Sequence, residues 1–335
     1  MKKFLLKFLR FALFLSVGLI LLYYAVKEVN PEEFWNKLKN ADFIWVALAL
    51  LASLLGYMSR AYRWKLLIKP LNYNPSFWNV FYAVMIGYTV NFAWPRIGEI
   101  TRCGILRKTD NVPVDSLLGT VIIERALDML ILISVLVVIF FARINFFGRF
   151  LTNEVFNPIL EALSKLSLLK WMIVLVAIVL LFLLLRYLAS HFSHNPVIRK
   201  LKRIYRGVIV GLKTIAKMED RWVFILHTLI IWTMYFLMTY VLLFAFPSTS
   251  QLKPIDGLFL LVVGGLGMAA PVQGGIGTFH LLITLALLLY GIPHADAVAY
   301  AVISHESQSI FAIFLGAISF FMIFMQTKRN RKPIV

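Results

Sequence analysis

Charged side chains cluster around a proline break near residue 95, in a chain that is otherwise strongly apolar. Arg96, Glu99 and Arg102 recur every third residue, so they share one side of a helix. Glu99 can pair with either arginine, which leaves one positive charge over. A guanidinium fork in a sheltered polar cavity suits a phosphate, because it can donate to two oxygens at once. Asn91 adds an uncharged donor. We interpret the group as part of an anion-binding site; the alternative is a cytoplasmic loop with ordinary surface charges.

A second charged group opens the next long apolar run, at Glu124, Arg125 and Asp128. The two carboxylates share a helix face, and Arg125 can reach Asp128. Ionisable groups in a span cost at least about 2.5–3.5 kcal/mol each on insertion scales, so each needs a partner or a function. We expect a charge network with Arg96 and Arg102; the plainer alternative is stabilisation of the carboxylates by the helix dipole.

A glycine-rich turn, Gly274, Gly275 and Gly277, interrupts an apolar region in the second half of the chain. Glycines permit backbone angles closed to other residues and let other groups approach closely. Gly277 opens a helix whose free N–H groups can hold an anion. The Lys-Ser/Thr pair that a nucleotide phosphate loop needs is absent, so a nucleotide is not expected. A tight helix–helix turn is the structural alternative.

His280, His305 and Glu306 are the remaining candidates for buried polar chemistry. Histidine changes protonation near neutral pH, so a proton-coupled step is one interpretation. A hydrogen-bonded packing pair of His305 and Glu306 is the favoured one. A metal site would need more ligands at suitable spacing, so we expect neither a metal nor a cofactor.

The elements that must position these groups are membrane helices. Of 335 residues, 61% are hydrophobic and 15% charged, whereas a soluble domain is about 25% charged. Apolar runs of about 17–25 residues can cross the hydrocarbon core as helices. The clear candidates are Phe11–Val26, Phe43–Met58, Leu117–Phe141, Leu168–Leu185, Trp222–Phe246 and Val298–Met325. Phe77–Trp94 and Gly257–Tyr290 are apolar but broken. We predict an all-α polytopic membrane protein with about six full transmembrane helices and two re-entrant helical hairpins.

The basic residues predict which loops face the cytoplasm. The formal charge of +18 fits anionic lipid headgroups in so apolar a chain, and nucleic acid is not expected. Arg60 and Arg63 are assigned to a cytoplasmic loop after the span that ends at Met58. With an even number of full spans, six, both termini are expected on this cytoplasmic side. Residues 195–218 combine apolar residues at helical spacing with basic ones, which indicates an interfacial amphipathic helix. A plain cytosolic connector is the alternative.

The order of spans and hairpins repeats along the chain. We predict one integral membrane domain, 1–335, whose half-repeats are 1–165 and 166–335, the second inverted. Broken segments in corresponding halves point to a substrate site near the bilayer midplane. The N-terminal run lacks a cleavage site and is expected to remain as the first span. Cys103, the one cysteine, excludes an internal disulfide.

Three ordered motifs resemble the lysylphosphatidylglycerol synthase transmembrane-region family, also described as flippase-like, the membrane half of bacterial multiple peptide resistance factors. They are Arg96-Ile97-Gly98-Glu99-x-x-Arg102, Glu124-Arg125-x-x-Asp128 and Pro271-x-x-Gly274-Gly275-x-Gly277. The chain departs from the family pattern where Pro95 replaces a common glycine, Gln273 a proline and His280 a frequent acidic residue. The soluble aminoacyl-transferring domain is missing, so lipid aminoacylation is not expected.

The resemblance implies a lipid flippase or transporter, not an enzyme, that moves a phospholipid or polyprenyl-phosphate-linked lipid between leaflets. It implies the bacterial cytoplasmic (inner) membrane, with phosphate-bearing membrane lipids as partners and a homo-oligomer or a membrane-enzyme partner left open. Two alternatives remain. One is an integral-membrane enzyme acting on a lipid-linked sugar, with Glu99 or Asp128 as base or with carboxylates holding a metal. The other is a non-catalytic lipid-binding partner of a synthase.

Overall fold

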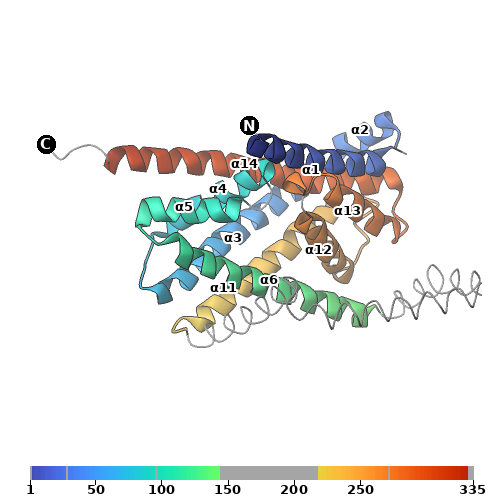
Figure 1. Cartoon of the computed structure of the whole chain (residues 1–335). Helices are drawn as coiled ribbons and strands as arrows, with labels where there is room; N and C mark the ends of the chain where they lie inside the picture. Colours follow the sequence, from blue (N-terminus) through green and yellow to red (C-terminus); the bar gives the residue numbers. More distant parts are fainter. Residues whose placement is uncertain (1, 28, 95–96, 144–217, 271, 331–335) are drawn as a thin grey trace, which may run out of the picture. The chain divides into compact units, whose positions relative to one another are not determined.

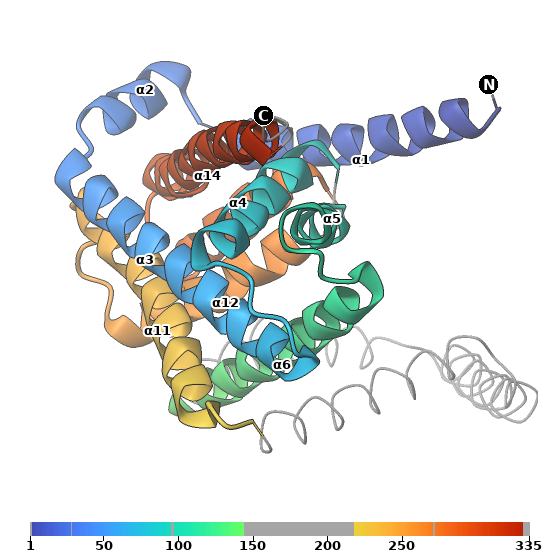
Figure 2. The ribbon, with the colours of Figure 1, turned by 90° about the vertical axis from the view of Figure 1, so that its left-hand side faces the viewer.

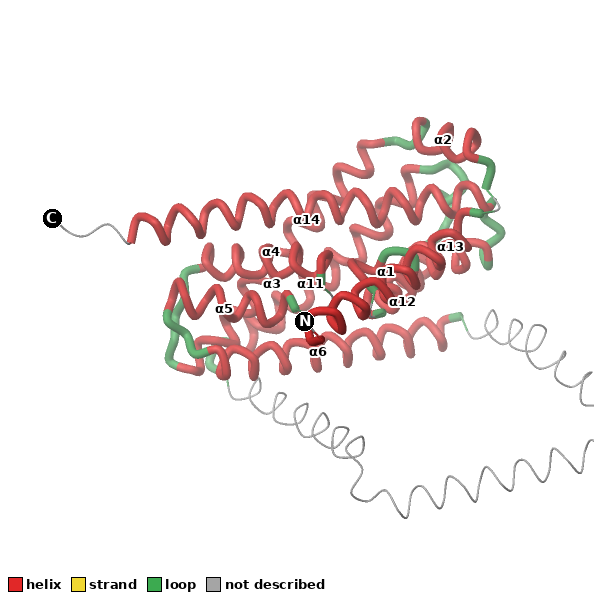
Figure 3. The backbone as a smooth tube through the Cα atoms, turned by 45° about the horizontal axis from the view of Figure 1, so that its top comes forward, coloured by secondary structure: helices red, strands yellow, loops and turns green. Residues whose placement is uncertain are grey.

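The computed structural model describes residues 2–27, 29–94, 97–143, 218–270 and 272–330. Every regular element within these ranges is helical (Figure 3), which confirms the all-α prediction. The chain divides into two compact units, one formed by residues 1–125 and 215–335 and the other by residues 126–214. The candidate site belongs to the first unit, and the two units are considered separately. The half-repeat boundary at residue 165 and the predicted span Leu168–Leu185 lie outside the described residues, as does the interfacial helix 195–218 except for its last residue.

Four segments among the described residues are long and apolar enough to cross a membrane. They are Phe43–Leu71, Val114–Ala142, Arg221–Ala245 and His294–Arg329. Their principal helices are α3 (Phe43–Ile68), α6 (Val114–Ala142), α11 (Arg221–Tyr240) and α14 (His294–Asn330), with the short 3-10 turns η1 (Lys69–Leu71) and η4 (Val241–Ala245) extending α3 and α11. The predicted spans Phe43–Met58, Leu117–Phe141, Trp222–Phe246 and Val298–Met325 are thus confirmed as helices of sufficient length and apolar composition.

The first predicted span corresponds to α1 (Lys2–Val26), whose apolar part is Phe14–Val26. A short helix, α2 (Pro31–Lys39), follows it. Asn30 caps α2 by accepting hydrogen bonds from two backbone N–H groups of the first turn, and proline occupies the first helical position. The ion pair between Lys37 and Asp296 (2.9 Å) joins α2 to the start of α14.

The broken run near residue 95 forms an antiparallel helical hairpin, which we call the first hairpin. It consists of α4 (Phe77–Ala93) and α5 (Gly98–Asp110). At its open end the Asn79 amide donates to both carboxylate oxygens of Asp110, at 3.2 and 3.0 Å. Near its tip Gly87 and Gly98 meet so closely that a Cβ on either glycine would collide with the other's carbonyl oxygen. The two helices therefore pack backbone against backbone.

The glycine-rich region forms a second hairpin, made of α12 (Pro254–Ala269), the turn η5 (Gln273–Gly275) and α13 (Thr278–Leu288). Its open end is marked by the ring contact of Phe259 with Tyr290, whose centroids are 6.0 Å apart. Close to its turn, a Cβ at Gly267 would lie 2.7 Å from the Cα of Phe279. The glycines of α12 therefore let this helix pack closely against α13.

The long helices hold the two hairpins together. Helix α3 runs along α11, and α14 packs against both α4 and α13 (Figures 1 and 2). The hairpin tips are in contact, because a Cβ on Gly274 of the second hairpin would overlap the ring of Phe92 in the first. The polar groups at the two breaks are thereby brought into one part of the first unit.

Candidate functional site

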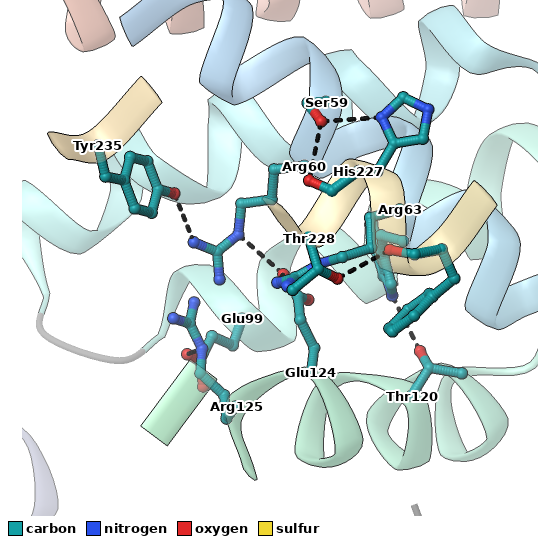
Figure 4. A network of polar contacts seen from close by, with 12 residues as sticks. Ser59, Arg60, Arg63, Glu99, Thr120, Glu124, Arg125, His227, Thr228 and Tyr235 are labelled. Atoms are coloured by element: carbon teal, nitrogen blue, oxygen red, sulfur yellow. Dashed lines mark hydrogen bonds and ion pairs between the residues drawn. The ribbon is translucent and has the colours of Figure 1, made fainter. Parts of the chain in front are cut away.

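Three arginines, Arg60, Arg63 and Arg102, converge on one buried carboxylate. Figure 4 shows two of them, Arg60 and Arg63, beside Glu124. Glu124 of α6 is fully buried, and its Oε1 accepts from Arg60 Nε at 2.8 Å and lies 3.5 Å from Arg63 Nη2. Its other oxygen, Oε2, accepts from Arg102 Nη2 at 2.6 Å. The three guanidinium groups come from α3 and α5 and are themselves buried. One carboxylate therefore ties the first hairpin, α3 and the start of α6 together.

The assignment of Arg60 and Arg63 to a cytoplasmic loop is wrong. Helix α3 continues to Ile68, ten residues past the predicted end at Met58, and both side chains point into the bundle. No proline or glycine interrupts the chain between Met58 and Lys69, so nothing local stops the helix. That absence of a breaker is the signal that should have extended the predicted span.

The tryptophan beside Arg63 fixes the geometry of the network. Trp64 is fully buried, and its Nε1 donates to the Thr120 hydroxyl at 2.9 Å. The Arg102 guanidinium lies over its ring, 4.2 Å from the centroid, as a cation–π contact. Arg60 Nη1 donates to the Tyr235 hydroxyl of α11 at 2.8 Å. These contacts hold the arginines in place on rigid helices.

A second, more accessible ion pair lies next to the buried one. Arg125 Nε is 2.6 Å from Glu99 Oε1, and the two side chains are 41% and 30% exposed. The predicted charge network between the two sequence motifs is confirmed by this pair and by the pair of Arg102 with Glu124. The partners differ from expectation in one respect, because Glu99 reaches Arg125 of the other motif and not Arg102 of its own helix.

The remaining members of the two motifs complete the charge count. Arg96 lies outside the described residues. Asp128 lies one turn beyond Glu124 along α6, in the second unit, and has an interaction partner of its own. Within the first unit, Arg60, Arg63, Arg102 and Arg125 contact two carboxylates, those of Glu99 and Glu124. In these contacts the arginines outnumber the carboxylates by two.

Asn91 and the three glycines shape the hairpin tips. Asn91 Oδ1 accepts from the Gly98 N–H at 2.8 Å, which closes the gap between α4 and α5. Gly274, Gly275 and Gly277 all have positive φ, at 57°, 79° and 79°. A Cβ on Gly277 would collide with the Gly18 carbonyl of α1, so α1 covers the start of α13. Anion binding at that helix start stays a prediction.

His280, His305 and Glu306 meet at the turn of the second hairpin. Their ligand atoms lie within 4.8 Å of one another. His305 Nδ1 is 2.9 Å and His280 Nε2 is 3.4 Å from Glu306 Oε1. His305 Nε2 is 2.8 Å from the carbonyl oxygen of Gly274. The predicted hydrogen-bonded pair of His305 and Glu306 is confirmed, and the addition of His280 is a result of tertiary packing.

Comparison with known proteins places this architecture in a family. The family model for the lysylphosphatidylglycerol synthase transmembrane region matches residues 8–316. A UPF0104 membrane protein of Pyrococcus horikoshii is 25% identical over 346 aligned positions, covering 98% of each chain. Another, of Methanocaldococcus jannaschii, is 27% identical over 125 residues, which span 36% of this chain and 37% of that protein. No solved structure matches the chain significantly. The apolar helices and the match over most of the chain lead to one conclusion: this integral membrane protein belongs to the lysylphosphatidylglycerol synthase transmembrane-region family.

Proposed function

We propose that this protein moves a lipid with a phosphate-bearing headgroup, a phospholipid or a polyprenyl-phosphate-linked lipid, between the membrane leaflets. The observation that carries the proposal is the convergence of three buried arginines on Glu124. Burying charge is costly unless opposite charge and hydrogen bonds compensate for it. An excess of guanidinium groups on rigid helices is therefore suited to an anion that arrives and leaves.

The pair of Arg125 and Glu99 is the entrance to this cluster in the proposal. It is the part-exposed ion pair next to the buried one, so an incoming phosphate meets it first. The phosphate displaces the Glu99 carboxylate from Arg125 and takes its place on the guanidinium fork. Arg60, Arg63 and Arg102 stay in their buried contacts and supply the positive field that makes the exchange favourable.

In the proposal, the two hairpins form the path along which the lipid headgroup moves between the leaflets. Helices α4, with 17 residues, and α5, with 13, are about 25 and 20 Å long at 1.5 Å per residue. Both are shorter than a hydrocarbon core of about 30 Å. We infer that the two hairpins enter the bilayer from opposite faces and meet at their tips near the midplane, as in inverted-repeat transporters. Cytoplasmic termini and a non-enzymatic role belong to the same proposal.

The test measures translocation of fluorescent phosphatidylglycerol in proteoliposomes by reduction of the label in the outer leaflet. Arg125→Gln is compared with Arg107→Gln, because Arg107 is exposed on α5, outside the cluster. We expect Arg125→Gln to slow translocation by at least about tenfold, as a lost charged hydrogen bond of 1.4 kcal/mol or more implies. Arg107→Gln should match the unmodified protein.

Two results would overturn the proposal. One is translocation by folded Arg125→Gln at the unmodified rate, with monodisperse elution as the criterion of folding. The other is a change in lipid mass after incubation, because chemical modification of the lipid would indicate an enzyme. Arg125→Lys keeps the charge without the planar fork and should retain an intermediate rate.

A further inference from the structure

The two hydrogen-bond contacts of His305 require one more proton than a neutral imidazole ring carries. Its Nε2 faces the Gly274 carbonyl oxygen at 2.8 Å, and its Nδ1 faces Glu306 Oε1 at 2.9 Å. A carbonyl and an ionised carboxylate only accept hydrogen bonds, whereas a neutral imidazole carries one N–H. Both contacts are hydrogen bonds only when the pair of His305 and Glu306 holds one additional proton.

His280 does not supply this proton. Its Nδ1 accepts a hydrogen bond from the Gly277 backbone N–H at 3.3 Å, so its single ring proton is on Nε2. That nitrogen faces Glu306 Oε1 at 3.4 Å and donates towards it. Glu306 Oε1 thus accepts from both rings, and hydrogen bonds to the charged form favour the ionised carboxylate. The additional proton therefore belongs to His305, as an imidazolium.

Among the residues that the structure describes, few titratable groups contact His305. The titratable groups in contact with it are Glu306 on its own helix and His280 on α13. The other aromatic neighbour from α13 is Phe279, with ring centroids 5.3 Å apart. From α4, Phe92 packs against Gly274. The proton is held at the point where α14 and the tips of both hairpins meet.

We propose that His280, His305 and Glu306 form a binding site for a transported proton, and that this proton is the coupling ion for lipid movement. The coupling role rests on the proposed function, whereas the proton-binding site does not. Without the proton, two lone-pair acceptors face each other at 2.9 Å, or His305 gives up its bond to Gly274. Deprotonation thus favours separation of α14 from the turn of the second hairpin. By linkage, the conformation that lacks this contact binds the proton less tightly, so proton release and hairpin opening drive each other.

The same three side chains could hold a divalent metal, and the hydrogen bonds argue for the proton. A metal needs lone pairs on His280 Nε2 and His305 Nδ1. A neutral His280 would then carry its proton on Nδ1, where it would face the Gly277 N–H. The proton satisfies all four contacts at once, whereas the metal breaks one of them.

The first test does not depend on transport. Solid-state NMR of full-length protein in lipid, labelled with 15N-histidine, reports how many ring nitrogens carry protons. The chain has six histidines, so single substitutions can assign the signals. We expect a doubly protonated ring that loses one proton when the pH is raised. His305→Gln should remove the signal.

The second test measures coupling. We compare phosphatidylglycerol translocation at about pH 6 and about pH 8 and take the ratio, which is independent of each variant's basal rate. A one-proton site permits a ratio of up to about a hundredfold, because the proton concentration differs by that factor between the two pH values. His305→Gln should bring the ratio to one. His294→Gln is the matched control, because His294 begins the same helix and bonds through Nε2 to the Ala25 carbonyl of α1 at 3.1 Å. It should keep the unmodified ratio.

The outcomes separate the two proposals. A His305 ring that stays singly protonated throughout, or stoichiometric zinc binding that abolishes the doubly protonated signal, overturns the proton site. An unchanged pH ratio in folded His305→Gln overturns the coupling role. Absence of any translocation by the unmodified protein counts against the lipid-transport function and the coupling role, while the NMR titration still decides the proton site.

Discussion

Replacing Glu124 by glutamine should destabilise the protein more than any other isosteric change in the described network. The amide keeps the size of the side chain and removes the charge on which Arg60, Arg63 and Arg102 converge. Its NH₂ group also points a donor at a guanidinium group, where only an acceptor fits.

The expected magnitude follows from the burial of the cluster. Glu124 is fully buried and its arginine partners are at most 5% exposed, so solvent cannot take over the lost contacts. Removing one partner from a buried ion pair typically costs about 3–5 kcal/mol. The lower figure alone reduces the ratio of folded to unfolded protein by roughly a hundredfold.

The assay is thermal unfolding in mild detergent, followed by the fraction of monodisperse protein after heating. Glu219→Gln is the matched control, because the Glu219 side chain is 88% exposed and its contact with Lys69 is long, at 3.5 Å. The control should stay within about 0.5 kcal/mol of the unmodified protein. Glu124→Asp keeps the charge on a shorter side chain and should recover part of the loss. If Glu124→Gln proves as stable as Glu219→Gln, the argument that this carboxylate holds the helices together is refuted.

Two further predictions concern α5. Gly98→Leu should prevent the first hairpin from closing, because a Cβ there meets the Gly87 carbonyl; Gly104→Ala on the same helix has open space around it and should fold normally, as elution from a sizing column will show. The Cys103 thiol is fully buried, so a maleimide cannot reach it in the folded protein. Cys103 should resist maleimide until the protein is denatured, whereas Lys108→Cys, at an exposed position, should label in the folded state. Rapid labelling of native Cys103, or normal elution of Gly98→Leu, would contradict these expectations.

The hairpins illustrate what local sequence can predict. Proline and glycine breaks within apolar runs indicate interrupted membrane helices whatever the rest of the chain does. The chain is indeed helical on both sides of each break, with turns beginning at Trp94 and Ala270. The ends of these helices follow from local backbone chemistry, so they are readable from the sequence.

The charged network shows what the local sequence cannot predict. Motif spacing predicted that the charged groups of α5 and α6 would interact, because an ionisable group in an apolar environment needs a partner. It did not predict which groups pair, since Glu99 and Arg125 belong to different helices. It missed Arg60 and Arg63 altogether, because basic residues after an apolar run are also typical of a cytoplasmic loop. Only the packing of α3 against its neighbours distinguishes the two cases.

The sequence by itself determined the class of the protein: its apolar runs exclude a soluble fold, its breaks mark two hairpins, and its motifs identify the family. Composition and periodicity suffice for this, since each element's relation to lipid depends on its own residues. The tertiary structure alone decided that three arginines share Glu124 and that His280 joins His305 and Glu306 at the turn of the second hairpin. These contacts join residues on separate helices, and their partners depend on how whole helices pack, which no local pattern records.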